Sequence, residues 1–475
     1  MRGSWLALLP VVVLLVALAV RVSGPQVVLS GDTLQLLDGV AATDACLHNG
    51  ELRCKRGVGQ WPPLQYLPAL FFKRIGLDRT RTAHGLVHLN GLAVLGTLFL
   101  LWLAGRRLGP GLAPILVLTG LASPLLWYGR TGFGEALATL ATTAVVVAIL
   151  LGWRPAVIAV ALWAATLSKE TALPALLVLA LLTTFVRAGF KRPSARSLVP
   201  VALGAGAGVV SLALFNLFRF GVPWNDYYLS GDWRMYGLVW KVDFAVAGLV
   251  APNAGLVWFW PVAAALLGVL GVGAVRRLRR SRDAGAAVVV AVLLVLAGLL
   301  AAFADWWTPF GWQAFGDRFI VPWVPALVVV AAAAWRAPLA VAVKAFAASR
   351  VRVISAGCVI SVFGLAQLGA FLAPLQPMRL FSRPSVCAPM PNLFERIPAG
   401  DPVAHELHSR CLATLAWRQP PVLVDAYHGL TGTRAGFAAL YVLAVAGLLA
   451  LTAQSSRRPP EWPDARAAVK LPAGL

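Results

Sequence analysis

Charged side chains are scarce in this 475-residue chain, and acidic ones are the scarcest. Asp and Glu number 19 against 41 Lys and Arg, charged residues make up 13% of the chain, and hydrophobic residues make up 59%. The mean hydropathy is +0.77, whereas soluble domains are about half apolar and a quarter charged. This balance excludes a soluble domain and predicts an all-α, polytopic membrane protein.

The signatures of several enzyme classes are also missing. The sequence has no P-loop, no Gly-x-Ser-x-Gly elbow, no paired Cys-x-x-Cys and no Rossmann fingerprint. These absences exclude nucleotide-dependent and serine-hydrolase chemistry. No repeat of fixed period, low-complexity tract or separate soluble domain is present either.

Apolar runs long enough to cross a hydrocarbon core of roughly 30 Å recur along the chain. We expect twelve membrane-spanning helices, with the first retained as an anchor rather than cleaved as a secretory signal. Ser168-Lys169-Glu170-Thr171 divides one run into two short crossings, because a single crossing would move later cationic clusters to the outer side. The twelve ranges are 4–22, 84–104, 110–128, 133–152, 155–168, 171–187, 198–218, 253–274, 284–303, 319–336, 353–373 and 436–453.

The net charge of +22 is explained by the positions of the basic residues. Clusters such as Arg106-Arg107, Lys191-Arg192 and Arg276 to Arg282 lie between alternate apolar runs. Basic residues mark cytoplasmic loops. We therefore expect a multi-pass plasma (inner) membrane protein with both termini cytoplasmic, surrounded by membrane lipids and binding no nucleic acid.

The predicted spans divide the chain into four regions. They are a transmembrane core at 1–373 with its first outer loop at 23–61, an extracytoplasmic cap at 374–434, a last span at 435–453 and a disordered cytoplasmic tail at 454–475. Frequent prolines make long regular helices unfavourable in the cap.

The cysteines fit this division. Cys46 and Cys54 share the first outer loop, and Cys387 and Cys411 share the cap. Disulfides persist outside the cytoplasm, so we expect two bonds, Cys46–Cys54 and Cys387–Cys411, the second stapling a small outer cap. Cys358 is expected to be a lone buried thiol; the alternative is that some of the other four are free.

Five short stretches follow one another over about residues 1–335. They are Ser30-Gly31-Asp32 with Trp61-Pro62-Pro63-Leu64-Gln65-Tyr66, Tyr128 to Glu135, Ser168 to Thr171, Asn216 to Pro223, and Phe315 to Pro325. Taken in order, they resemble the GT-C superfamily of membrane glycosyltransferases, such as dolichyl-phosphate-mannose protein mannosyltransferases and the bacterial lipid A aminoarabinose transferase. The resemblance implies an inverting sugar transfer at the outer face from a polyprenyl-phosphate donor, with an Asp of the first outer loop as general base.

Asp32 is the first candidate for that base. It follows the first apolar run directly, which places its carboxylate at the outer membrane surface. Asp38 is the second candidate, because the Leu34 to Leu37 stretch lacks the Tyr usual in the family. The alternative for Asp32 is a helix cap before Thr33.

Other charged residues suit the remaining roles. Glu135 is a second catalytic acid that orients acceptor or metal, or else a carboxylate favoured by a helix start. Arg318, Lys169 and Arg130 are candidates for binding the donor phosphate. Arg318 could instead be an interfacial anchor, and Lys169 an internal partner of Glu135 or its neighbour Glu170.

Substrate contacts are assigned to Asp226, Tyr227, Tyr228 and Asp317, although aromatic residues at this depth also form ordinary interfacial belts. The pairs His84 and His88, and His405 and His408, are expected to be structural, because no third ligand accompanies either at a recognisable spacing. The cofactor is therefore unknown, with a divalent metal left open.

The sequence thus predicts a glycosyltransferase that acts on an unidentified lipid, glycan or protein acceptor. Two alternatives stay open. A transporter or flippase for a lipid-linked or polar substrate should show inverted repeats and midplane polar residues. A non-catalytic scaffold would lack the loop Asp chemistry.

Overall fold

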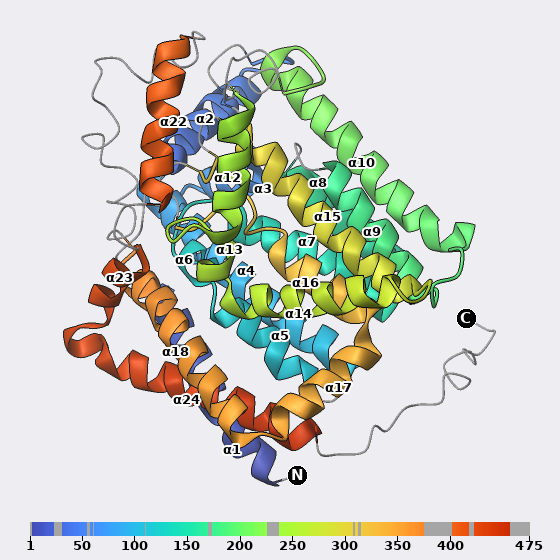
Figure 1. The fold of residues 1–475 in the computed structure, drawn as a ribbon. Coiled ribbons are helices and arrows are strands. Elements are labelled where there is room, and N and C mark those ends of the chain that lie inside the picture. Colours follow the sequence, from blue (N-terminus) through green and yellow to red (C-terminus); the bar gives the residue numbers. More distant parts are fainter. Residues whose placement is uncertain are drawn as a thin grey trace.

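The computed structural model describes residues 2–22, 31–54, 58–59, 61–109, 111–169, 173–225, 237–306, 309–311, 315–374, 401–417 and 422–456. Within these ranges the chain forms helices and turns, with no β-strand (Figure 1). The predicted all-α class is therefore confirmed.

The first part of the chain forms a transmembrane bundle with two helices on its first loop. These helices are α1 (Arg2–Val22), α2 (Gly31–His48), α3 (Pro63–Arg74), α4 (Arg79–Leu108), α5 (Leu112–Leu121), α6 (Leu125–Tyr128), α7 (Glu135–Leu151), α8 (Pro155–Ser168), α9 (Leu173–Arg187) and α10 (Ala195–Phe220).

The second part completes the bundle. It comprises α12 (Leu238–Val250), α13 (Leu256–Phe259), α14 (Pro261–Leu278), α15 (Ala284–Ala304), α16 (Val324–Ala334), α17 (Arg336–Ala347), α18 (Arg350–Leu372), α22 (Pro402–Trp417), α23 (Val422–Ala426), the 3-10 turns η2 (Tyr427–Leu430) and η3 (Gly432–Arg434), and α24 (Ala435–Ser456).

Six of the described helices are long and apolar enough to cross a membrane, namely α4, α10, α14, α15, α18 and α24. The pair α16 and α17 passes the same test as one span, bent by 97°. The shorter apolar helices are α1, α5, α7, α8 and α9. Every predicted range therefore contains a helix, whereas the number that cross the membrane stays a prediction.

The core of the bundle contains helices that are apolar on all sides. Every residue of α5 and α16 is buried. A helix that is apolar all round belongs inside a bundle rather than at its surface. The outer helices α10 and α15 instead expose large apolar side chains, such as Leu203 and Leu294, as expected of surfaces that face lipid.

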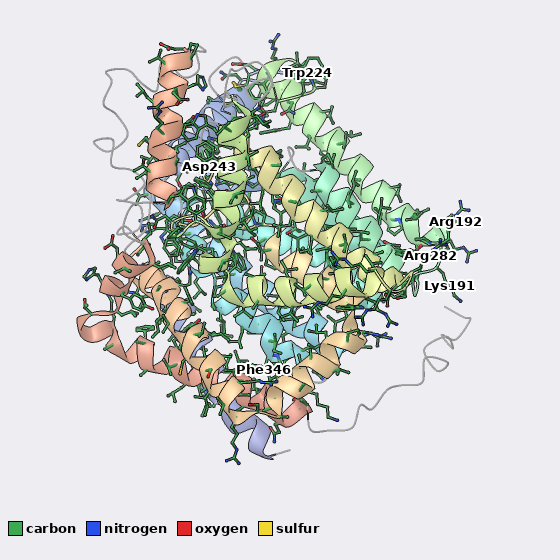
Figure 2. The ribbon with its side chains drawn as sticks, viewed as in Figure 1. Lys191, Arg192, Trp224, Asp243, Arg282 and Phe346 are labelled. Carbon is green, nitrogen blue, oxygen red and sulfur yellow. A yellow bond between two sulfur atoms is a disulfide. The ribbon has the colours of Figure 1, made fainter. Side chains whose placement is uncertain are left out.

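Several basic residues gather at one end of the bundle. Figure 2 shows Lys191, Arg192 and Arg282 together at one end, and Trp224 and Asp243 at the other. The end of α24 lies at the cationic end too, because a Cβ added to Gly111, after the Arg106-Arg107 pair, would meet Ser456 Oγ at 2.8 Å.

Several helices lie outside the predicted spans. The first outer loop at 23–61 contains the 18-residue helix α2, which was not predicted. Helices α12, α17 and α22 were not predicted either. Helix α12 is apolar but has only 13 residues, too few for a span, whereas α2, α17 and α22 contain polar or charged residues. Here α2 and α3 matter most, because they position the candidate site.

The cysteine predictions have mixed outcomes. Cys46 and Cys54 form a disulfide, as predicted. Cys411 is disulfide-bonded, and its predicted partner Cys387 lies outside the described residues, as do residues 375–400 and 418–421 of the predicted cap and the tail from 457. The prediction of a buried Cys358 is wrong: this thiol is exposed on α18, on a face that lipid would cover.

Candidate functional site

Three charged side chains from distant parts of the chain meet in one cluster. Lys169 Nζ and Arg318 Nε both donate to Glu135 Oε1, at 3.1 Å and 2.7 Å. The Glu135 side chain is 1% exposed, that of Lys169 16% and that of Arg318 10%. Two cations on one carboxylate leave a net positive charge. The part of this group that solvent reaches belongs to the two cations. We call these three residues the Glu135 cluster.

Each member of the Glu135 cluster stands at a helix boundary. Glu135 is the first residue of α7, where the helix dipole favours a carboxylate. Lys169 directly follows α8, and Arg318 lies in the turn before α16. The ends of three helices therefore bring these charges together, although 34 and 183 residues separate the two cations from Glu135 in the sequence.

Aromatic rings support both cations. The Arg318 guanidinium lies 4.1 Å from the centre of the Phe133 ring, and Lys169 Nζ lies 5.8 Å from that of Phe319. Phe319 in turn stacks on Phe303 with ring centres 4.8 Å apart. A ring face attracts a cation that has lost part of its water. Each cation is thus held by Glu135 and by a ring.

Asp317 precedes Arg318 and is 4% exposed. Its Oδ1 accepts the Phe319 N–H at 3.0 Å. Burial raises the pKa of this carboxyl to about 7, although backbone N–H groups oppose the rise. Helix α12 packs directly on it, since a Cβ added at Gly248 would lie 3.0 Å from Asp317 Oδ2. Burial therefore favours the neutral form of this carboxyl more than it would for an exposed Asp.

The chain from Gly129 to Gly134, which we call the 129–134 segment, leads into Glu135. The Asn90 amide donates to the carbonyls of Thr131 at 2.7 Å and Phe133 at 2.6 Å. Gln65 Nε2 donates to the carbonyl of Gly132 at 2.8 Å. Helices α4 and α3 thus fix the segment. Neither amide was predicted, although a buried Asn inside an apolar run was the available signal.

The start of α2 packs on the same segment. A Cβ added at Gly132 would lie 2.4 Å from Thr33 Oγ1. Asp32 precedes Thr33 in the first turn of α2, so its backbone lies beside the 129–134 segment, whereas its side chain lies outside the described residues. Asp38 is 66% exposed and pairs with Arg79 at 2.8 Å. The structure thus brings the start of α2, and not Asp38, to this region.

Arg130 does not belong to the Glu135 cluster. It is fully buried, its Nη1 donates to the Phe371 carbonyl at 2.9 Å, and its guanidinium lies 5.4 Å from the centre of that ring. Phe371 and Gly129 also line a cavity of about 290 Å³ between α1, α4, α6 and α18. That cavity is almost wholly apolar, with His88 as its one ionisable lining residue.

The end of α10 holds the first outer loop. Arg219 Nη1 donates to the carbonyls of Trp61 at 2.7 Å and Gly59 at 3.3 Å, and the Cys54 N–H donates to the Phe218 carbonyl at 2.8 Å. The Trp61 and Asn216 to Pro223 stretches of the sequence therefore form one unit. Arg219 was not predicted as a functional residue.

The predicted substrate contacts Asp226, Tyr227 and Tyr228 lie outside the described residues. A nearby aromatic residue has a defined partner: Trp240 Nε1 on α12 donates to Glu406 Oε2 on α22 at 2.8 Å. This hydrogen bond joins the bundle to the described part of the predicted cap.

Within the ranges that the structure describes, one group of His, Cys, Asp or Glu side chains lies close enough together to hold a metal ion. That group is Cys46 and Cys54 with Glu51, and its two sulfurs are bonded to each other. It contains no histidine. His405 and His408 are buried in α22, and their predicted structural role stays a prediction.

No protein-family model and no curated protein matches the sequence. Among solved structures, the chain is similar to ArnT from Cupriavidus metallidurans in the apo state, with a TM-score of 0.43 and 15% identity over 95% of this chain and 78% of that one. The same protein bound to undecaprenyl phosphate gives a TM-score of 0.43 and 13% identity, over 90% of this chain and 78% of that one.

Proposed function

We propose that the chain is a membrane glycosyltransferase that moves a sugar from a polyprenyl-phosphate donor to a lipid, glycan or protein acceptor at the outer membrane face. The end of the bundle that holds Trp224 is then outside, and both termini are cytoplasmic. The observation that carries this proposal is the Glu135 cluster, where two partly accessible cations share one buried carboxylate.

The departing lipid phosphate needs this kind of site. As the bond from the anomeric carbon to the phosphate oxygen breaks, negative charge grows on the phosphate, and fixed cations stabilise it. Arg318 supplies planar donors that match phosphate oxygens, and Lys169 supplies a point charge. Glu135 holds both in place beforehand, so the transfer does not have to order them.

Inverting transfer also needs a base on the opposite face of the sugar. We assign this role to Asp32, which takes the proton of the acceptor hydroxyl as that oxygen attacks the anomeric carbon. The packing of Thr33 on Gly132 supports the assignment, because it brings the first turn of α2 beside the segment that leads to Glu135. Asp38 remains the second candidate.

The structure bears on the other predicted roles as well. Glu135 accepts from both cations, which supports a positioning role rather than contact with a metal. The apolar cavity beside Arg130 suits an isoprenoid chain, since its walls offer almost no polar group. Asp226, Tyr227, Tyr228 and Asp317 remain proposed contacts to sugar or acceptor.

Binding of undecaprenyl phosphate to the purified protein tests the site. Arg318→Ala and Lys169→Ala should each weaken binding by about tenfold or more, because each removes a charge-assisted contact. Lys241→Ala is the matched control: its salt bridge to Asp305, at 2.6 Å, lies in the half-exposed part of α12, and binding should stay unchanged.

Equal binding by wild type, Arg318→Ala and Lys169→Ala would contradict the assignment. Loss of binding in Arg130→Ala alone would move the phosphate to the apolar cavity. If wild type instead carries labelled lipid phosphate across vesicle membranes without sugar transfer, the chain is a transporter or flippase. Wild type that neither binds nor transfers is a scaffold.

A further inference from the structure

The stem of Arg318 lies against a glycine. Gly311 has a φ of +84°, and a Cβ added there would lie 2.6 Å from Arg318 Cβ and 2.8 Å from its Cδ. The carbonyl of the adjacent Phe310 accepts the Arg318 N–H at 2.9 Å. Glycine is the residue that adopts this φ without steric cost and leaves the space to the arginine stem.

Two further contacts define where the guanidinium lies. Its Nε donates to Glu135 Oε1 at 2.7 Å, and its face lies over the Phe133 ring at 4.1 Å. Gly311 bounds the stem, while Phe133 and Glu135 bound the head. A side chain held at both ends moves at the head when the stem is displaced, because the intervening bonds stay in staggered rotamers.

We infer that Gly311 is a positioning residue: its lack of a side chain sets the Arg318 guanidinium between Phe133 and Glu135 and thereby sets the affinity of the site for a lipid phosphate. The part that concerns lipid phosphate rests on the proposed function. The part that concerns the guanidinium rests on the packing alone.

Two substitutions separate displacement from backbone strain. Gly311→Ala adds a Cβ and also strains the backbone. Gly311→Asn adds the same Cβ, but Asn tolerates a positive φ better. Gly316→Ala is the matched control, because Gly316 has a φ of +73° and its added Cβ would meet Phe259 Cδ1 at 2.9 Å rather than Arg318.

The experiment has two readouts on the full chain in lipid nanodiscs. The first is a cryo-EM map of each variant without ligand. In Gly311→Ala and Gly311→Asn, the guanidinium should leave the Phe133 ring and Glu135, whereas in Gly316→Ala it should stay. The second is the affinity for undecaprenyl phosphate, which should fall by about tenfold in both Gly311 variants, as for a lost charge-assisted contact, and stay unchanged in Gly316→Ala.

Arg318 in its wild-type place in Gly311→Asn would overturn the inference, and so would a displaced Arg318 with unchanged affinity. An equal fall in Gly316→Ala would also overturn it, since strain alone would then explain the effect. If wild type does not bind undecaprenyl phosphate, the proposed function fails, while the maps still decide whether Gly311 positions the guanidinium.

Discussion

Replacing Glu135 by Gln tests whether one carboxylate anchors two cations. The variant keeps the size of the side chain but removes its charge, so Lys169 and Arg318 lose their shared anion. Their side chains are only 16% and 10% exposed, and water replaces the lost contact poorly. We therefore expect the variant to be less stable and its two cations to repel each other.

The magnitude follows from the burial. Breaking a buried ion pair costs about 3–5 kcal/mol. The partial exposure of both cations and the amide oxygen left in Gln place this change at the lower end, at about 3 kcal/mol. For 475 residues the entropy of unfolding is about 1 kcal/mol/K, so each kcal/mol lowers the apparent Tm by about 1 °C. Glu135→Gln should therefore melt roughly 3 °C below wild type.

A phosphate ligand should reverse much of that loss. In the wild type Glu135 already offsets part of the charge of Lys169 and Arg318, whereas in Glu135→Gln an incoming phosphate supplies the missing anion. A ligand at a hundred times its Kd stabilises by about 2.7 kcal/mol. Undecaprenyl phosphate should therefore raise the apparent Tm more in Glu135→Gln than in wild type.

The assay is thermal unfolding in detergent with and without undecaprenyl phosphate. The control is Glu406→Gln, whose carboxylate is 43% exposed and pairs with Arg410 one helical turn away. Such pairs contribute about 1 kcal/mol or less. If Glu135→Gln had the same apparent Tm as wild type, Glu135 would not anchor the two cations. The same conclusion would follow if undecaprenyl phosphate raised the apparent Tm of the variant no more than that of wild type.

Three further predictions concern other regions. In membranes, Arg282→Cys should react with an impermeant maleimide only after permeabilisation and Trp224→Cys in intact cells; outside labelling of both would contradict the orientation. A non-reducing digest should yield Cys387 linked to Cys411, and free Cys387 would refute that bond. Because burial raises the pKa of Asp317 to about 7, its stabilising contribution is complete in acid and is lost as pH rises through 7; Asp317→Asn should flatten this loss between pH 5 and pH 8, and equal slopes in thermal unfolding would contradict it.

Hydropathy predicts the positions of the long bundle helices but not that of α2. Runs such as 284–303 are apolar on every face, and hydropathy alone identifies them. The 18 residues of α2 include three Asp and mix polar with apolar residues. Packing of Thr33 on the 129–134 segment places this helix, and a contact about 100 residues away in the chain is not visible in local composition.

The sequence predicted which residues form the candidate site but not how they are arranged. Glu135, Lys169 and Arg318 are ionisable residues at the ends of apolar runs. Burying a charge there costs free energy, so such residues stand out in the sequence as candidates for function. A Lys169–Glu135 pair was one of the alternatives. That both cations share one oxygen depends on how α7, α8 and α16 pack, and Gly311 matters only through the space it leaves.

Sugar transfer itself tests the central claim most directly. Purified protein is incubated with radiolabelled polyprenyl-phosphate sugars and a cell-envelope extract as acceptor, in parallel with Asp32→Asn. We expect wild type to transfer label and Asp32→Asn to fall by about 10²-fold or more with donor binding retained, because the variant keeps shape but cannot take the proton. Equal transfer by both proteins would contradict Asp32 as the base, and no transfer by wild type from any of the donors would contradict the glycosyltransferase assignment.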